Sequence, residues 1–230
     1  FLAIVGLLVL FAAAAAVGLF LWLAPEEPEV PPRTILALDL TQSLAERAAA
    51  DPLEELVFEP APSLRDVVDA LQRAASDPRV VGVFALLGDD VYGFATTQEL
   101  RAAIKAFRAS RKPAIAFADS FGEFGSGLRS YYLATAFDEI WLQPGGSVGL
   151  VGLRSENPFL RDVLEKIGVE PRFERREEYK TVFNNFIESG FTKAHKEELE
   201  RLLGTLYRQV ARDVAASRGL APEAAERLLG

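Results

Sequence analysis

The sequence contains no cysteine, no methionine and only one histidine. Without cysteine there are no disulfide bonds, no thiolate metal sites and no cysteine nucleophiles. His195 alone cannot build a multi-histidine zinc site, and it lies in a charged run typical of a solvated helix face. A place for His195 in a Ser-His-Asp triad is the less favoured alternative. We therefore expect neither a metal nor a cofactor.

Positive charge is also scarce in this chain. Acidic residues outnumber basic residues by 33 to 25, and the formal net charge is −8. Nucleic-acid-binding proteins usually present a basic face to the phosphate backbone. We therefore expect no nucleic-acid partner.

Charged residues are absent from the first 25 positions. A helix of about 23 residues, at about 1.5 Å per residue, spans roughly 34 Å, which is enough for a bilayer core of about 30 Å. The apolar part of a cleaved signal peptide is shorter, about 7 to 15 residues. We predict a transmembrane anchor over residues 1–24, with the lipid bilayer as its partner, and a stiff proline-rich linker over residues 25–33. Because the chain starts at Phe1 and lacks methionine, we expect it to be a fragment without its true N-terminus.

From residue 34 onward, short β-rich runs alternate with helical runs. Such alternation predicts right-handed βαβ crossovers and an α/β domain with a mostly parallel sheet. We assign residues 34–230 to one domain. The expected strands are 34–40, 80–87, 113–118, 139–143 and 169–174, and the expected helices are 63–77, 96–112, 125–137, 158–168, 192–217 and 222–229.

Two stretches look like catalytic motifs but favour a structural explanation. The glycine-rich run at 145–152 lacks the lysine of a Walker motif, so it indicates a tight turn rather than a nucleotide site. Ser126 and Ser130 lie near an expected helix start, where serine commonly caps the helix. We favour that role for both serines over a nucleophilic one.

Lys180 lies where a charged stretch becomes apolar, within residues 173–186. Lysine is a poor base at neutral pH because its unperturbed pKa is about 10.4. An apolar environment disfavours the ammonium form, and a desolvated lysine can accept the proton of a serine hydroxyl. With no cysteine and one histidine, lysine is the most economical base available. The alternative is an ordinary solvated side chain.

Three motifs in a fixed order carry a family resemblance. They are GLRSYYLATAFDEIWLQP, GSVGLVG and FLRDVLEKIGVEPRFERREEYKTVFNNF. Together they resemble the signal peptide peptidase A (protease IV) family, and most of all the N-terminal half of its long, tandem-repeat form. The resemblance implies a Clp/crotonase-like spiral of βαβ units. It makes residues 34–230 the N-terminal peptidase repeat, with a C-terminal repeat absent from the fragment.

The resemblance also implies an activity. Members of this family are membrane-anchored serine endopeptidases that face the outside of the cytoplasmic membrane and degrade cleaved signal peptides with a Ser-Lys dyad. The Tyr-Lys motif of the family matches Tyr179-Lys180, so Lys180 is the expected general base. Ser147 matches a serine that orients this lysine. The nucleophile position is occupied by Leu128, so the nucleophile serine is expected outside this fragment.

Two alternatives to the peptidase remain. The chain could be a catalytically silent scaffold of the same fold that oligomerises and delivers peptides to a partner, or a soluble acyl-thioester enzyme, which the anchor disfavours.

The family often has a glycine pair after the second strand that supplies oxyanion donors. This chain departs from that pattern, because it has only the separated Gly88 and Gly93 there. We expect extended apolar peptides as ligands and a homo-oligomer as the assembled state.

Overall fold

The computed structural model describes residues 5–7, 10–11, 14–15, 18–19, 30–46, 62–123, 125–174 and 176–230. Most of the predicted anchor (1–24) and linker (25–33) lies outside these ranges. Within them, no helix has the length and apolar character needed to cross a bilayer. The membrane anchor therefore stays a prediction.

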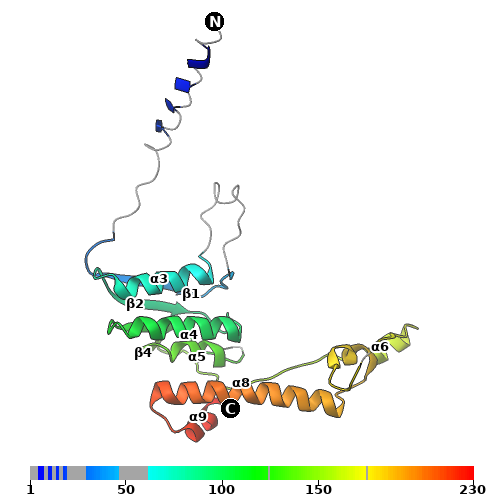
Figure 1. Ribbon diagram of the computed structural model, residues 1–230. Coiled ribbons are helices and arrows are strands. Elements are labelled where there is room, and N and C mark those ends of the chain that lie inside the picture. Colours follow the sequence, from blue (N-terminus) through cyan, green and yellow to red (C-terminus); the bar gives the residue numbers. More distant parts are fainter. Residues whose placement is uncertain are drawn as a thin grey trace.

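Four parallel strands form the sheet at the centre of the fold (Figure 1). They are β1 (Thr34–Leu40), β2 (Val80–Leu87), β3 (Ala114–Ala118) and β4 (Glu139–Leu142), and they lie side by side in chain order. Each bound is within one residue of the prediction. The expected α/β class with a parallel sheet is confirmed.

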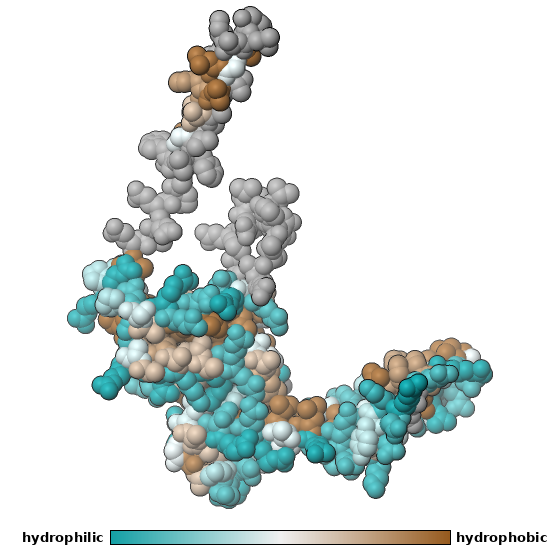
Figure 2. Space-filling view, in the orientation of Figure 1, coloured by the Kyte–Doolittle hydropathy of each residue, from teal (hydrophilic) through white to brown (hydrophobic). Residues whose placement is uncertain are grey.

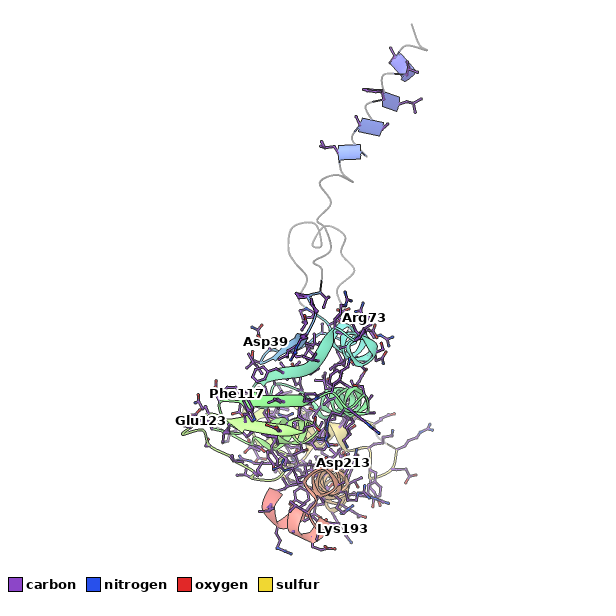
Figure 3. The ribbon with its side chains drawn as sticks, turned by 90° about the vertical axis from the view of Figure 1, so that its left-hand side faces the viewer. Asp39, Arg73, Phe117, Glu123, Lys193 and Asp213 are labelled. Carbon is purple, nitrogen blue, oxygen red and sulfur yellow. The ribbon has the colours of Figure 1, made fainter. Side chains whose placement is uncertain are left out.

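Three helices connect successive strands and cover one face of the sheet. They are α3 (Leu64–Ser76), α4 (Phe94–Arg108) and α5 (Leu128–Ala134). The strand order never reverses, so right-handed crossovers place every connecting helix on the same side. Figure 3 shows this arrangement, with the strands that carry Asp39 and Phe117 on one side and α3 with Arg73 on the other.

The main hydrophobic core lies between the sheet and these helices. Alternate residues of the strands, such as Val83 and Ala85, face Leu71 of α3 and Ile104 of α4. Burying a side chain of the size of leucine or isoleucine stabilises the fold by about 1.5–3 kcal/mol. The residues facing the other way are less covered, and Trp141 is about half exposed.

The starts of α3 and α4 differ in how well the sequence predicts them. Ser63 caps α3, and Asp66 completes a capping box through a bond from the Ser63 N–H. The start expected for the 96–112 helix is two residues late, because α4 begins at Phe94 with Gly93 as its cap. Phe94 packs against the cluster around Leu128, and this tertiary contact extends the helix beyond the local signal.

Two C-terminal helices lie below the sheet in Figure 1: α8 (Lys193–Arg218) and α9 (Pro222–Leu229). At about 1.5 Å per residue, the 26 residues of α8 span roughly 39 Å. Gly219 ends α8 with a φ of 65°, a left-handed conformation that favours glycine. A second core cluster joins the C-terminal part of α8 to α5 and α9 through Leu128, Tyr132, Val210, Ala211, Val214 and Leu229.

The N-terminal part of α8 extends away from the sheet, and a segment that contains α6 lies beside it (Figure 1). We call the described residues of 158–191 the arm. It contains α6 (Arg161–Lys166), a 3-10 turn η1 (Thr181–Phe183) and α7 (Asn184–Ile187). Apolar side chains on the arm are exposed to solvent, and Figure 2 shows them as a brown strip along its upper edge.

The strand predicted over 169–174 is wrong, because the structure has no strand there. The segment shows the expected apolar alternation of Val169 and Phe173, but a strand also needs a neighbour to pair with. Among the described residues, no strand of the sheet pairs with this segment. Phe173 stacks instead on Phe183, with ring centroids 4.4 Å apart.

Candidate functional site

Lys180 lies in a tight turn on the arm, immediately before η1. Its backbone has φ −85° and ψ 73°, and its N–H donates to the carbonyl of Glu177 at 3.4 Å. Its side chain is exposed and makes no ion pair or hydrogen bond with any described residue. Among the described residues the lysine amine therefore has no competing partner, but it also lacks the apolar cover that a neutral amine needs.

The two neighbours of Lys180 attach its turn to α8. The Tyr179 hydroxyl donates to Glu197 at 3.1 Å, and the Thr181 hydroxyl donates to Glu198 at 2.8 Å. The bond to Glu197 raises the pKa of the Tyr179 phenol. Because consecutive residues of one helix accept both bonds, the backbone at Lys180 is held in place while its side chain stays free.

Ser147 lies in the glycine-rich run after β4. Its N–H donates to the hydroxyl of Ser120 at 3.0 Å, and the two hydroxyl oxygens are 3.4 Å apart. Its carbonyl accepts from Phe121 at 2.8 Å, which makes a short parallel bridge between residues 121 and 148. No hydrogen bond joins Ser147 to Lys180 in the described structure, so its role in orienting the lysine stays a prediction.

Leu128, at the expected nucleophile position, is fully buried at the first residue of α5. It packs against Val210 and Val214 of α8 and Leu229 of α9. A side chain there serves as a contact between α5 and the C-terminal helices. The position is therefore part of the core in this chain.

Ser126 and Ser130 are both engaged in hydrogen bonds that support the loops around α5. The Ser130 hydroxyl donates to the carbonyl of Gly88 at 2.6 Å and accepts from the N–H of Asp90 at 2.6 Å. The Ser126 hydroxyl donates to the carbonyl of Gly152 at 3.2 Å. Both serines therefore have structural bonds, but the predicted capping role is wrong: the N-cap of α5 is Gly127 without a side-chain cap bond, and Ser130 lies inside the helix.

His195 is not on a solvated helix face, and that expectation is wrong. It is only 5% exposed and packs against the rings of Phe159 and Phe191, with centroids 6.1 and 4.9 Å away. Its Nε2 lies 3.2 Å from the side-chain amide of Asn157, and its Nδ1 is buried without a hydrogen-bond partner. With no carboxylate bonded to it in the described chain, His195 packs the base of the arm.

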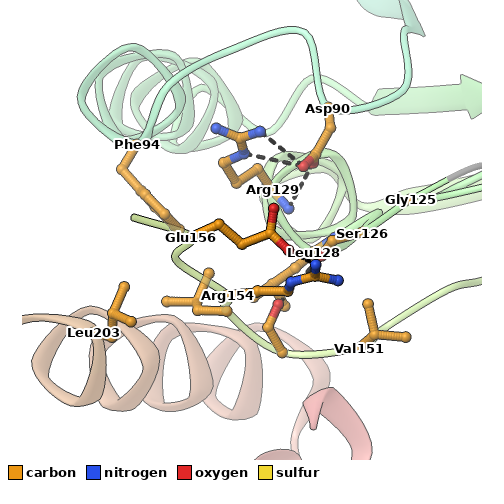
Figure 4. Close-up of a pocket in the computed structure, with 12 residues that line it drawn as sticks. Asp90, Phe94, Gly125, Ser126, Leu128, Arg129, Val151, Arg154, Glu156 and Leu203 are labelled. Carbon is orange, nitrogen blue, oxygen red and sulfur yellow. Dashed lines mark hydrogen bonds and ion pairs between the residues drawn. The ribbon is translucent and has the colours of Figure 1, made fainter. Parts of the chain in front are cut away.

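A cleft of about 720 Å³ opens beside the N-terminus of α5 (Figure 4). It lies between the loop after β2, the loop before α5, the irregular segment 151–156 and one turn of α8. Its apolar walls come from Phe94, Leu128, Val151, Leu153 and Leu203, and its charged side chains are Asp90, Arg129, Arg154 and Glu156. Figure 4 shows Leu203 of α8 and Val151 approaching the cleft from below.

Two acidic residues after β2 bind backbone N–H groups that face this region, and the sequence analysis missed them. Asp90 accepts from the N–H groups of Arg129 and Ser130 at 3.1 and 3.3 Å and pairs with the Arg129 guanidinium at 2.9 Å. Asp89 accepts from the N–H of Gly122 at 2.6 Å. These groups are therefore not available to stabilise a substrate oxyanion. Asp90 lies at the N-terminus of α5, where a carboxylate is favoured, but α5 is distant from Asp90 in the chain, so the local sequence carries no signal for this contact.

A buried network around Arg101 was also missed. Its guanidinium bonds to the carbonyl of Tyr132 and, at 2.7 Å, to the hydroxyl of Thr135, and it lies 3.8 Å from the centroid of the Tyr132 ring. Burial lowers the pKa of Arg101 and raises that of Tyr132 to about 12, and the Tyr132 hydroxyl also donates to Asp213. The network joins α4, α5 and α8, so it supports the wall of the cleft.

Lys180 and the cleft beside α5 are thus separate features of the structure. Among the described residues, the amine of Lys180 has no serine hydroxyl bonded to it, and the hydroxyls of its neighbours Tyr179 and Thr181 are bonded to α8. The cleft offers apolar walls, and the hydroxyl of its lining residue Ser126 is bonded to Gly152. No hydrogen bond or ion pair links Lys180 to the cleft residues among those described. A serine reaction at Lys180 needs a hydroxyl supplied from elsewhere.

Comparison with known proteins places these features in a family. Residues 106–228, more than half of the chain, match the model of peptidase family S49. Protease 4 of Haemophilus influenzae is 32% identical over 177 residues, which cover 74% of this chain and 28% of that protein. Protease 4 of Salmonella typhi is 28% identical over 166 residues, covering 70% of this chain and 25% of that protein.

A plant relative also matches part of this chain. The chloroplastic serine protease SPPA of Arabidopsis thaliana is 30% identical over 145 residues, which cover 63% of this chain and 21% of that protein. The chain thus spans about a quarter of the length of these curated relatives. The matched residues contain α5, the glycine-rich run and the Lys180 turn. The resemblance to the protease IV family is confirmed: the chain belongs to peptidase family S49.

Proposed function

We propose that this chain is one repeat of a membrane-anchored serine peptidase that degrades cleaved signal peptides. The observation that carries the proposal is the match to peptidase family S49, which includes the Lys180 turn. The relatives named Protease 4 and the serine protease SPPA support a serine mechanism. Since those relatives are about four times longer than the matched part, a further repeat is expected to complete the site.

In this proposal Lys180 is the general base. Its neutral amine accepts the proton of a serine hydroxyl from the other repeat while the serine oxygen attacks the peptide carbonyl. The lysine then donates that proton to the leaving amine, and water hydrolyses the acyl-enzyme to regenerate the serine. The fixed turn between Tyr179 and Thr181 supports this role because it holds the backbone from which the lysine side chain extends. The other repeat would supply the missing apolar cover, and Ser147 would orient the amine in the completed site.

The remaining parts of the proposal follow from the anchor and the family. Residues 1–24 would cross the cytoplasmic membrane once and hold the domain on its outer side. The parallel sheet with helices on one face is compatible with a Clp/crotonase-like spiral of βαβ units. The exposed apolar strip of the arm supports assembly into an oligomer, because large exposed apolar patches usually mark interfaces.

Substitution of the lysine tests the catalytic role. Loss of a general base costs about 10²- to 10⁴-fold in rate, so Lys180→Ala in the whole protein should reduce peptidase activity on a signal peptide by that factor. Lys105→Ala, an exposed lysine on α4, is the matched control and should leave the rate unchanged. Undiminished activity in Lys180→Ala would eliminate the catalytic proposal.

A second candidate is a catalytically silent scaffold of the same fold that oligomerises and delivers peptides. The observation that favours it is Leu128, which fills the expected nucleophile position with a buried core side chain. A scaffold predicts that Lys180→Ala leaves both the oligomer and any cleavage by a partner protease unchanged. The same pair of variants therefore separates the two functions.

A further inference from the structure

We propose that His195 is a pH-sensitive latch, which holds the arm against α8 while its ring is neutral and releases the arm when the ring is protonated. Histidine is the side chain that ordinarily changes its charge between about pH 5 and 8. His195 is the one histidine of the sequence, and it is buried where α8 meets the arm. The case for the latch comes from what surrounds this ring.

The two ends of the arm meet on His195. Phe159 lies at the beginning of the arm and Phe191 at its end, and the edge-to-face contact between their rings has a centroid distance of 5.1 Å. Both rings also pack edge-to-face against the imidazole of His195. The backbone N–H of His195 donates to the hydroxyl of Thr192, which caps α8, at 3.2 Å. The imidazole therefore closes the base of the arm onto the first turn of α8.

The closed base satisfies only one ring nitrogen of His195. The side-chain amide of Asn157 lies 3.2 Å from Nε2, and Nδ1 is buried without a partner in the described structure. A neutral imidazole carries one N–H, whereas a protonated ring carries an N–H on each nitrogen and a positive charge. A buried donor without an acceptor is costly, and a buried unpaired charge is more so. Protonation of the ring therefore favours an open arm, in which water reaches both nitrogens.

The charged side chains of α8 near His195 do not compensate a charge on the ring. They are Lys193, Lys196, Glu197 and Glu198. Glu197 and Glu198 accept hydrogen bonds from Tyr179 and Thr181 of the arm. Lys196 pairs with Glu200 at 3.8 Å, and the two lysines would repel a protonated imidazole.

The segments that pack on this part of α8 do not compensate it either. Their charged side chains are Glu156, Arg161, Asp162 and Glu188. Glu156 pairs with Arg154, and Asp162 accepts from the hydroxyl of Ser189 at 2.6 Å. Within the described structure, the hydrogen-bond partner of the His195 ring is Asn157 and no carboxylate is bonded to it. A protonated ring would therefore be unpaired in the closed arm.

Release of the arm would also move the turn that carries Lys180, because that turn lies on the arm. The latch would then regulate the proposed general base through acid. This consequence rests on the proposed function. The latch itself does not, since opening of the arm can be measured without any cleavage.

Hydrogen exchange of the whole protein in lipid nanodiscs tests the latch. Peptides from the arm report its opening, and peptides from β2 and β3 serve as the internal control. Protection factors are compared because they remove the direct effect of pH on exchange. Between about pH 7.5 and about pH 5, the arm should lose protection by about tenfold or more, and the sheet should change by less than about twofold. Carboxyl groups ordinarily titrate near pH 4, below this range.

Three variants separate the charge of the ring from its packing. His195→Phe keeps an aromatic ring and His195→Gln keeps a polar group beside Asn157, and neither side chain titrates. Both should keep the arm closed over the whole pH range. Asn157→Asp places a carboxylate beside Nε2 and should reduce the acid effect to less than about twofold, since an opposite charge stabilises the protonated ring. Gln72→Glu, on the exposed surface of α3, is the matched control and should behave as the unchanged protein.

Each of several results would overturn the latch. One is equal protection of the arm at both ends of the pH range, and another is an equal loss in the sheet, which would mean general acid unfolding. An acid effect of the same size in both His195 variants or in Asn157→Asp would count against the ring, as would an arm that is open at the higher pH in both His195 variants. Lys180→Ala should leave the pH profile of the arm unchanged, so a failure of Lys180 in cleavage does not bear on the latch.

Discussion

Replacing Leu128 with serine introduces the residue type that the resemblance predicts for a nucleophile at this position, and the structure predicts a loss of stability instead of a gain in activity. Leu128 is completely buried between α5, α8 and α9. Shortening a buried leucine costs about 2–5 kcal/mol, and a buried hydroxyl without a partner adds about 1–3 kcal/mol. We therefore expect Leu128→Ser to lower the free energy of unfolding by roughly 3–8 kcal/mol.

Urea unfolding followed by circular dichroism measures this loss. Leu128→Met keeps the apolar volume and should cost less than about 1.5 kcal/mol, which makes it the matched control. Peptidase activity should not rise in Leu128→Ser, because the serine would lie in a packed core away from a free base. A serine variant as stable as the unchanged protein, or one with increased cleavage, would refute the assignment of Leu128 to the core.

Two further predictions concern stability. Ser63→Ala removes the cap of α3 and should lower the free energy of unfolding by about 1 kcal/mol in the same urea experiment, and an unchanged midpoint would contradict the capping role. Burial raises the pKa of Tyr132 to about 12, above the unfolded value of about 10. The contribution of the neutral phenol to the free energy of unfolding is therefore complete below about pH 10 and is lost as the pH rises towards 12. Tyr92, with a pKa also raised to about 12 by burial, should add to this alkaline loss. In unfolding measured from pH 9 to 12, the free energy of unfolding of Tyr132→Phe should fall less steeply with pH than that of the unchanged protein. An equally steep fall would count against the role of the buried phenol.

The four strands could be predicted from the sequence because their signals are local. Buried parallel strands appear as short continuous apolar runs, and β2 is such a run between two polar stretches. The capping box at Ser63 is likewise contained within four residues. The position of Lys180 after the charged stretch could be identified, but the attachment of its turn to Glu197 and Glu198 could not. That attachment depends on how the arm folds back onto α8.

Other features depend on contacts between distant segments, which local patterns do not encode. The 169–174 segment has the alternation of a strand, but no neighbouring strand pairs with it in the described structure. His195 has polar neighbours in sequence, yet Phe159 and Phe191 bury it. The cleft could not be predicted because its walls come from α4, α5, α8 and three separate loops. The contacts of Asp89 and Asp90 could not be predicted either, because their partners Gly122, Arg129 and Ser130 are distant in the chain.

Covalent labelling of the reactive serine tests the central claim most directly. A fluorophosphonate probe reacts with a serine whose hydroxyl is activated by a base, and mass spectrometry of the whole protein identifies the modified residue. The account predicts one labelled serine outside residues 34–230, with labelling lost in Lys180→Ala and retained in Lys105→Ala. Labelling of Ser126, Ser130 or Ser147, or full labelling in Lys180→Ala, would contradict it.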